Sequence, residues 1–463
     1  MDARKSSLAE SVLKYFRDFK VLRETRSEYW GMQIINFLDS TAFFSVLTMS
    51  VVLLSSDMGF SDQQAGYVVT LYGATTTICL FFSGMVSDWL GIRLSLYLSM
   101  VGQGLTRAAV VAAALMPGLT NRGTIVVVAF FLMAPFVAMV QTTFQAANKR
   151  FTTAGSRSAG FNLWYLFMNV GAAAAGFLID IVRKALGLHN AHVFTFAVFA
   201  AAGCIVIAML MVRREEQLLG PGETPMDEAK KDRRNPLQIA WSVLSKSVFW
   251  RFVVLVSMLI GVRAVFLYLH ILWPKYWLRV IGPDALIGTL MAINPILVIV
   301  GLIILIPVLN RFNVFKMLVY GGMISALSLF VLAIPTVGNA TYVTSVVALV
   351  VLTVGEVIWS PRLQEYTAAV APEGQEGTYL GLSMMPYFIA KTIVSALSGH
   401  MLVRWVPEDI GTKLRAGVVT FWDSPSALWM LLGVFALGGP LLALFLRGWL
   451  TKGVRLGHES AGN

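Results

Sequence analysis

The segment GMVSDWLGIR, from Gly84 to Arg93, is a short turn between two apolar runs that are each long enough to cross a bilayer. Gly84 lets helices approach closely, and Asp88 can pair with Arg93 or face the partial positive charge of a helix N-terminus. A weaker version, PVLNRFN, stands at residues 307–313 in the second half of the chain. This repetition predicts two related halves, and we expect Gly84, Asp88, Gly91 and Arg93 to form a gating loop.

The composition is that of an integral membrane protein. Of the 463 residues 57% are hydrophobic and only 13% are charged, whereas about a quarter of a soluble globular protein is charged. The net charge of +11 comes mostly from short loops between apolar runs, so we expect membrane lipids and no nucleic acid as partners. Cys79 and Cys204 lie within apolar runs, which argues against a disulfide framework and against a metal site.

Apolar runs of about 20 residues recur along the chain and predict an all-α protein with twelve transmembrane helices. The polar sequence RREEQLLGPGETPMDEAKKDRRNP, residues 213–236, cannot lie in a membrane and separates six runs from six. The predicted spans are 28–54, 64–86, 93–117, 122–147, 158–182, 190–212, 249–273, 285–309, 314–335, 340–360, 377–402 and 426–449.

These runs predict five parts of the chain. Residues 28–213 form an N-terminal six-helix half, 214–248 a cytoplasmic linker, 249–450 a C-terminal six-helix half, and 451–463 a cytoplasmic tail. Residues 1–27 contain apolar residues at helical spacing among basic ones, which predicts an amphipathic helix on the inner membrane surface or packed on the protein. Most loop lysines and arginines fall on the side of the termini, so both termini are expected in the cytoplasm.

Several motifs resemble those of a known family. The segment at 84–93 resembles the loop signature of the major facilitator superfamily, and the chain is similar to its proton-coupled oligopeptide transporters at GFNLWYLFMNVGA (160–172) and GEVIWSP (355–361). Weaker matches are GFSDQQAG at 59–66 and INP at 293–295. The resemblance implies the major facilitator fold, with two pseudo-symmetric halves of six helices, and a multi-pass protein of the bacterial inner (plasma) membrane.

The chain also departs from the pattern of the oligopeptide transporters. That family's first-helix motif falls on NFLDSTAFFS at residues 36–45, where one acidic residue remains and phenylalanines replace two tyrosines. The fourth-helix lysine of the family falls near Gln145. These differences favour a divergent relative that carries a different solute.

Five ionisable side chains interrupt the apolar runs: Asp39, Arg107, Arg263, Glu356 and Lys391. A charge at the centre of a membrane helix costs about 2.5–3.5 kcal/mol on insertion scales, so such residues usually serve function. At ~1.5 Å per residue, all but Glu356 fall at a similar depth, in the central layer where secondary transporters place their sites. Glu356 reaches this layer if its helix continues beyond the predicted end of its span.

We expect Glu356 and Asp39 to carry protons, with a static ion pair as the alternative for Glu356. Arg107 could either tie Asp39 structurally or bind the solute. Three cations against two acids favour a solute with a carboxylate or phosphate. The residues expected to bind the solute are Arg107, Arg263, Lys391, Gln145, Asn162, Tyr165, Asn294 and Trp359.

Four histidines, His189, His192, His270 and His400, are expected near the outer face, where they could sense pH or serve as ordinary surface residues. The sequence shows no nucleophile motif, phosphate loop or metal spacing, so we expect no enzyme activity and no cofactor. The predicted function is secondary active transport of a small organic solute, anionic or peptide-like, by alternating access with proton coupling, in a monomer. An exporter of amphipathic compounds and a non-transporting receptor are the alternatives.

Overall fold

The computed structural model describes residues 19–216, 218, 219, 245, 247–309, 312–370 and 385–452. Most of the amphipathic helix predicted for 1–27, most of the linker at 214–248 and most of the tail at 451–463 lie outside these residues. The first described element is a 3-10 helix, Phe19–Glu24. The described part of the chain consists of helices and their connections, without strands.

Six long helices form the first bundle. Pi-helical turns at Leu53–Asp57 and Ile181–Ala185 extend the first and fifth of them. Within the bundle α2 packs against α6 and α7, α4 against α5 and α7, and α3 against α5. The helices are α2 (Ser27–Val52), α3 (Asp62–Leu90), α4 (Ile92–Leu115), α5 (Arg122–Arg150), α6 (Ala154–Asp180) and α7 (Ala191–Met211).

The second bundle contains helices of more varied length. Its main contacts join α13 to α14 and α18, α12 to α14, and α10 to α16 and α18. The helices are α9 (Ser247–Met258), α10 (Ile260–Ile271), α11 (Trp273–Val280), α12 (Ile287–Leu309), α13 (Val314–Leu332), α14 (Ala340–Val370), α16 (Met385–Trp405), α17 (Ile410–Arg415), α18 (Pro425–Phe445) and α19 (Arg447–Leu450), with a 3-10 turn at Phe421–Asp423.

Each predicted span overlaps a described helix, except that 249–273 is covered by the two helices α9 and α10. In the described residues nine helices are long and apolar enough to cross a membrane, and α9 with α10 makes a tenth that is bent by 43°. The helices α3 and α16 occupy the two remaining predicted spans. The tenth span is longer than predicted, because α14 runs through Pro361 to Val370. Large apolar side chains such as Phe445, 85% exposed, cover the outside, as expected for a surface in contact with lipid.

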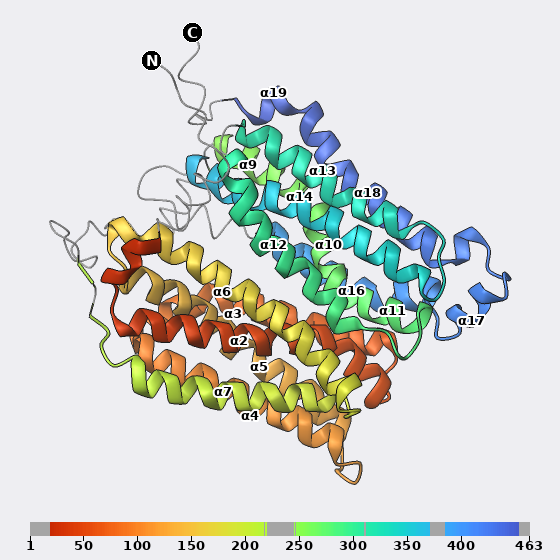
Figure 1. Ribbon diagram of the computed structural model, residues 1–463, viewed down its shortest axis with the longest axis horizontal. Helices are drawn as coiled ribbons and strands as arrows, with labels where there is room; N and C mark the ends of the chain where they lie inside the picture. The colour runs from red at the N-terminus through yellow and green to blue at the C-terminus, as the bar shows by residue number, and fades with distance from the viewer. Residues whose placement is uncertain are drawn as a thin grey trace.

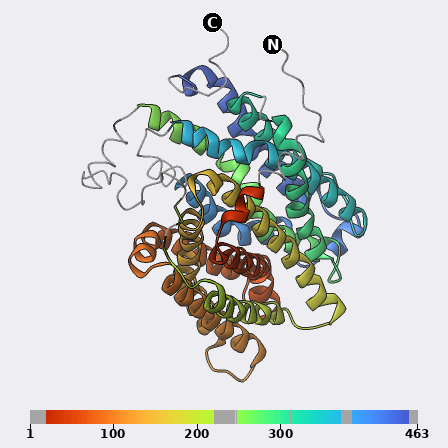
Figure 2. The ribbon, with the colours of Figure 1, turned by 60° about the vertical axis from the view of Figure 1, so that its left-hand side comes forward.

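The two bundles lie side by side, converge at the end that carries α11 and α17, and diverge toward the end that carries the chain termini (Figure 1). In the view turned by 60° the red-to-orange helices lie mainly in the lower part and the green-to-blue helices mainly in the upper part (Figure 2). Contacts between them join α3 to α16, α6 to α12, and α2 to α10 and α11. We call the convergent end, which includes Asp62 and Arg279, the sealed end, and the opposite end, which includes Gly91 and Phe312, the linker end.

Two glycines bring the bundles into backbone contact at the sealed end. A Cβ at Gly288 of α12 would lie 1.9 Å from the carbonyl oxygen of Gly176 in α6, so neither helix has room for a side chain there. Gly84 behaves differently, because a Cβ there would meet nothing within 4 Å. The close helix approach predicted at Gly84 is therefore not seen among the residues that the structure describes.

Gly288→Ala is expected to lower the melting temperature of the purified protein, because the new methyl group collides with backbone rather than with a flexible side chain. Overpacking of this kind costs roughly 1–3 kcal/mol. Thermal unfolding in detergent measures the effect, with Gly84→Ala as the matched control. The control should melt at or above the parent temperature, since alanine favours the helix. Equal melting of the two variants would contradict the contact.

Candidate functional site

A cavity of about 440 Å³ lies between the two bundles and takes its walls from both. This volume falls in the range of small-molecule sites, about 300–1,000 Å³. Six of the predicted site residues line it, although they come from five different helices: Tyr165, Arg263, Asn294, Glu356, Trp359 and Lys391.

Glu356 is held in the cavity by a neutral partner. The amide Nδ2 of Asn294 donates to Glu356 Oε2 at 2.9 Å and to Thr353 Oγ1 at 2.9 Å. Among the described side chains no cation forms an ion pair with this carboxylate. Tyr165 of the opposite bundle is within electrostatic range of Glu356. The predicted partners Arg263 and Lys391 therefore line the same cavity without neutralising Glu356.

Arg263 and Trp359 form one wall of the cavity. The guanidinium carbon of Arg263 lies 5.7 Å from the centre of the Trp359 ring, a cation–π geometry. Trp359 Nε1 donates to Ser325 Oγ at 3.1 Å, which fixes the ring. The bend between α9 and α10 at Leu259 comes four residues before Arg263.

Lys391 of α16 and His270 of α10 line the cavity and interact electrostatically with each other. His270, which was predicted near the outer face, is a wall residue of the cavity in the structure. Its Nδ1 is 3.2 Å from Thr48 Oγ1, and its ring packs on Phe44 at 5.7 Å. Its position follows from α2 and α10 lying against each other, a contact that loop and span boundaries do not reveal.

Asp39 lies in a second, smaller cavity of about 180 Å³, together with Gln145. Phe43, Phe44 and Gln141 line both cavities, so the two adjoin each other. Asp39 is 8% exposed, and its Oδ1 has no hydrogen-bond partner in the described structure.

Arg107 and Asn162 line neither cavity. Arg107 is 1% exposed and donates to Ala197 O at 3.3 Å and to Gln103 Oε1 at 2.5 Å, within the first bundle. It interacts electrostatically with Asp39, but these two described side chains form no ion pair within 4.0 Å. Asn162 is on an exposed face of α6. The predicted single layer of charges is thus divided between the central cavity and the interior of the first bundle.

The predicted gating loop is at the linker end. Gly91 has φ +80° and separates α3 from α4, and a Cβ there would lie 2.4 Å from Glu215 Oε2. The Glu215 carboxylate accepts hydrogen bonds from the backbone N–H of Ile92 at 3.2 Å and of Arg93 at 2.9 Å. Glu215 therefore caps the positive N-terminus of α4, a role that the sequence did not suggest. The side chain of Asp88 is outside the described structure.

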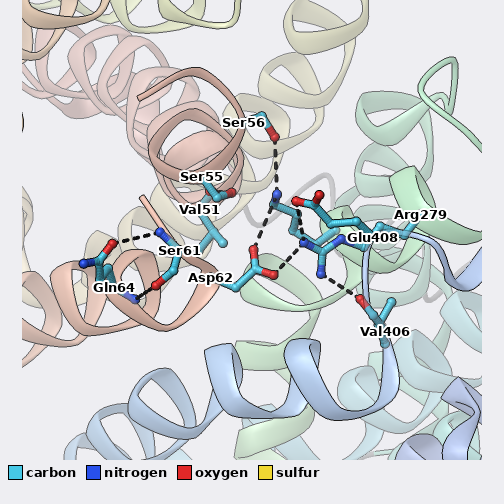
Figure 3. Close-up of polar contacts among 10 residues, drawn as sticks. Val51, Ser55, Ser56, Ser61, Asp62, Gln64, Arg279, Val406 and Glu408 are labelled. Atoms are coloured by element: carbon cyan, nitrogen blue, oxygen red, sulfur yellow. Dashed lines mark hydrogen bonds and ion pairs between the residues drawn. The ribbon is translucent and has the colours of Figure 1, made fainter. Parts of the chain in front are cut away.

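A buried ion-pair network closes the sealed end (Figure 3). Asp62, at the start of α3, contacts Arg279 Nη2 at 2.5 Å and Lys275 Nζ at 3.6 Å, both on α11 of the other bundle. Arg279 also reaches Glu408 at 3.7 Å and donates to Val406 O at 2.7 Å. The side chains of Asp62, Lys275 and Arg279 are 9%, 5% and 6% exposed. Asp62 belongs to the weakly matching segment GFSDQQAG at 59–66. The sequence did not indicate that its partners would be on α11.

A second carboxylate joins the bundles near this network. Asp180, at the end of α6, accepts from the backbone N–H of Gly288 at 2.9 Å and of Thr289 at 2.6 Å, and so caps the start of α12. Nearby, Lys184 donates to Asp284 at 2.5 Å, and this hydrogen bond and charge lower the pKa of the exposed Asp284 carboxyl. Every polar contact between the bundles that we find in the described structure involves the sealed end or the cavity.

Asp62→Asn is expected to open the sealed end, because it leaves Lys275 and Arg279 buried without their acid. Removing one partner of a buried pair costs about 3–5 kcal/mol. Ser398, 1% exposed on α16 where it packs against Gly66 of α3, serves as a reporter once it is changed to cysteine in a chain without Cys79 and Cys204. Maleimide labelling of this site should accelerate at least tenfold.

Asp409→Asn is the matched control, since Asp409 pairs with Lys413 on the exposed surface within one bundle at 2.7 Å. Labelling in the control should equal that of the parent. If Asp62→Asn labelled no faster than Asp409→Asn, the network would not hold the bundles together.

Comparison with known proteins agrees with this architecture. The chain is 23% identical over 434 residues, 90% of its length and 93% of the relative, to the uncharacterized MFS-type transporter YqjV of Bacillus subtilis (strain 168). Its fold is similar to a D-xylose–proton symporter, with a TM-score of 0.71 and 13% identity over 93% of this chain and 98% of that one.

It is also similar in fold to a peptide transporter POT in complex with sulfate, with a TM-score of 0.68 and 13% identity over 94% of this chain and 98% of that one. The sequence profile of the Major Facilitator Superfamily matches residues 30–395. The protein is a membrane transporter and not an enzyme, and it belongs to the Major Facilitator Superfamily.

Proposed function

We propose that this protein is a secondary active transporter that couples the movement of a small organic solute to protons. The observation that carries the proposal is the position of Glu356, whose carboxylate faces a cavity shared by both bundles and is held by the neutral amide of Asn294. A carboxylate without a cation partner can take up and release a proton without breaking an ion pair. Intramembrane acids of this kind are typical of proton relays.

Alternating access is the proposed mode of transport. The Asp62 ion pairs and the Asp180 cap at the sealed end are polar, and they cross directly from one bundle to the other. Rocking of the bundles around the cavity would break these contacts and bring the linker ends together. In this scheme α3, α4 and the start of the linker move as one unit, because they are connected through Gly91, Arg93 and Glu215.

We assign the linker end to the cytoplasm and the sealed end to the outside, on the basis of the basic loops. The structure then corresponds to a state that opens inward. The proposed division of the chain into halves at 28–213 and 249–450, joined by a cytoplasmic linker, follows from the same assignment. We propose a monomer in the bacterial inner membrane, with both termini in the cytoplasm.

An exporter of amphipathic compounds is the second candidate, and the apolar part of the cavity wall favours it. Phe43, Phe44, Phe266, Met168 and Met291 all line the cavity. Both candidates use the same proton site, but the solute moves with the proton in a symporter and against it in an exporter. A pH dye in vesicles with an imposed solute gradient distinguishes them, because a given solute gradient drives protons in opposite directions in the two cases.

Glu356→Gln is expected to abolish proton movement while leaving solute exchange intact, since glutamine keeps the size and the bond to Asn294 but cannot titrate. Proton movement is measured in proteoliposomes with an entrapped pH dye, to which pools of peptides, organic anions and phosphorylated metabolites are added. Solute exchange is measured by counterflow of a labelled compound from the pool that moves protons.

Asp423→Asn is the matched control, because it removes a carboxylate that pairs with Arg404 at the surface. Proton movement and solute exchange should both remain unchanged in this variant. Solute-driven proton movement that persists in Glu356→Gln would remove this residue from the coupling mechanism. Transport in the parent that is indifferent to the pH gradient would remove proton coupling altogether.

A further inference from the structure

Lys391 lines the cavity, and its ammonium group has no acceptor among the described side chains. Among the described residues it forms neither an ion pair nor a hydrogen bond, although its side chain is largely withdrawn from solvent. Its aliphatic stem is fixed across the interface, because a Cβ at Gly73 of α3 would lie 3.0 Å from Lys391 Cε. Buried charges in proteins are normally paired, so a positioned cation of this kind is suited to a negative ligand.

A second donor, His270, lines the same cavity as Lys391. Thr48 Oγ1 and His270 Nδ1 are 3.2 Å apart. When the Thr48 hydroxyl donates to Nδ1, the proton of the neutral imidazole resides on Nε2, which can then donate to a ligand. Phe44 packs on the ring and fixes its plane. His270 and Lys391 line the same cavity, so both donors are available to one bound anion.

The Glu356 carboxylate of the protein itself does not neutralise Lys391. Glu356 is bonded to Asn294 and Thr353 lies beside it on the same helix, and the carboxylate forms no ion pair with Lys391. Lys391 and Glu356 therefore line one cavity as separate groups. The acid remains available for a proton while the cation remains available for a solute.

The surrounding wall determines what kind of anion fits. Phe43, Phe44, Phe266 and Met291 supply an apolar and mainly aromatic surface, which favours the flat apolar body of a ligand. The cavity of about 440 Å³ is matched to a compact molecule. A highly charged phosphorylated metabolite would have to lose its hydration against these rings.

We propose that Lys391 and His270 form the carboxylate-binding subsite of the cavity, and that the solute is an amphipathic monocarboxylic acid with an aromatic or branched apolar body. The inference rests on the proposed transport function and names the substrate class of the same site. Lys391 neutralises the carboxylate, His270 donates to it, and the phenylalanines pack on the apolar part.

Binding to the purified protein tests the subsite without any gradient. Phenylacetate and 4-phenylbutyrate are the probes, and phenylacetamide and phenethylamine are their neutral and cationic counterparts. Isothermal titration should show that the carboxylates bind at least tenfold more tightly than the amide, and that the amine binds weakest. Lys391→Met should remove this preference while leaving the amide affinity unchanged, and Lys391→Arg should retain it.

Equal binding of acid and amide, tighter binding of the amine, or an unchanged preference in Lys391→Met would overturn the subsite. A folded variant is verified by its amide affinity and by its melting temperature. The result is independent of proton coupling, which Glu356→Gln tests in proteoliposomes. Gradient-driven transport of another solute without carboxylate preference would refute the subsite alone, whereas carboxylate binding without proton-linked flux would refute the coupling alone.

Discussion

The ion pairs between Asp62 of α3 and the cations Lys275 and Arg279 of α11 are the interaction on which the arrangement of the two bundles depends. Lipid tails are as apolar as leucine side chains, so burial of apolar surface gives little net attraction between helices in a membrane. Association then depends on close packing and on polar contacts. The sealed end provides both, through the Gly176–Gly288 contact and the Asp180 cap on α12.

Alternating access, as proposed above, requires these contacts to separate. Opening the sealed end removes two carboxylate-centred networks but admits water, which solvates the released charges. The free-energy difference between the sealed and the opened state is therefore a small difference between the lost ion pairs and the gained hydration. A ligand shifts this equilibrium only by the difference between its affinities for the two states. The cavity lies directly behind the seal, where Thr48 and His270 connect the bundles. In the proposed alternating-access cycle a bound solute would therefore contact the helices that move.

The sequence predicted the fold because membrane helices are long, apolar and separated by polar turns, and each predicted span overlaps one or two described helices. Depth along a helix was also informative, since Arg263 and Lys391, which were predicted in one layer, both line the cavity. Depth does not give rotation about the helix axis, however. Arg107 is at a similar depth but points into its own bundle toward Gln103 and Ala197. The pairing of Asp62 with Arg279 joins residues far apart in the chain, and no local pattern encodes it.

Distances between the bundles at both ends test the central claim most directly. Spin labels at the exposed positions Leu188 and Val418 report on the sealed end, and labels at Trp89 and Phe312 report on the linker end. Pulsed electron resonance in nanodiscs, with and without Asp62→Asn, measures both pairs. The account predicts that the substitution lengthens the Leu188–Val418 distance and shortens the Trp89–Phe312 distance. Distances that do not change, or that change in the same direction at both ends, would contradict it.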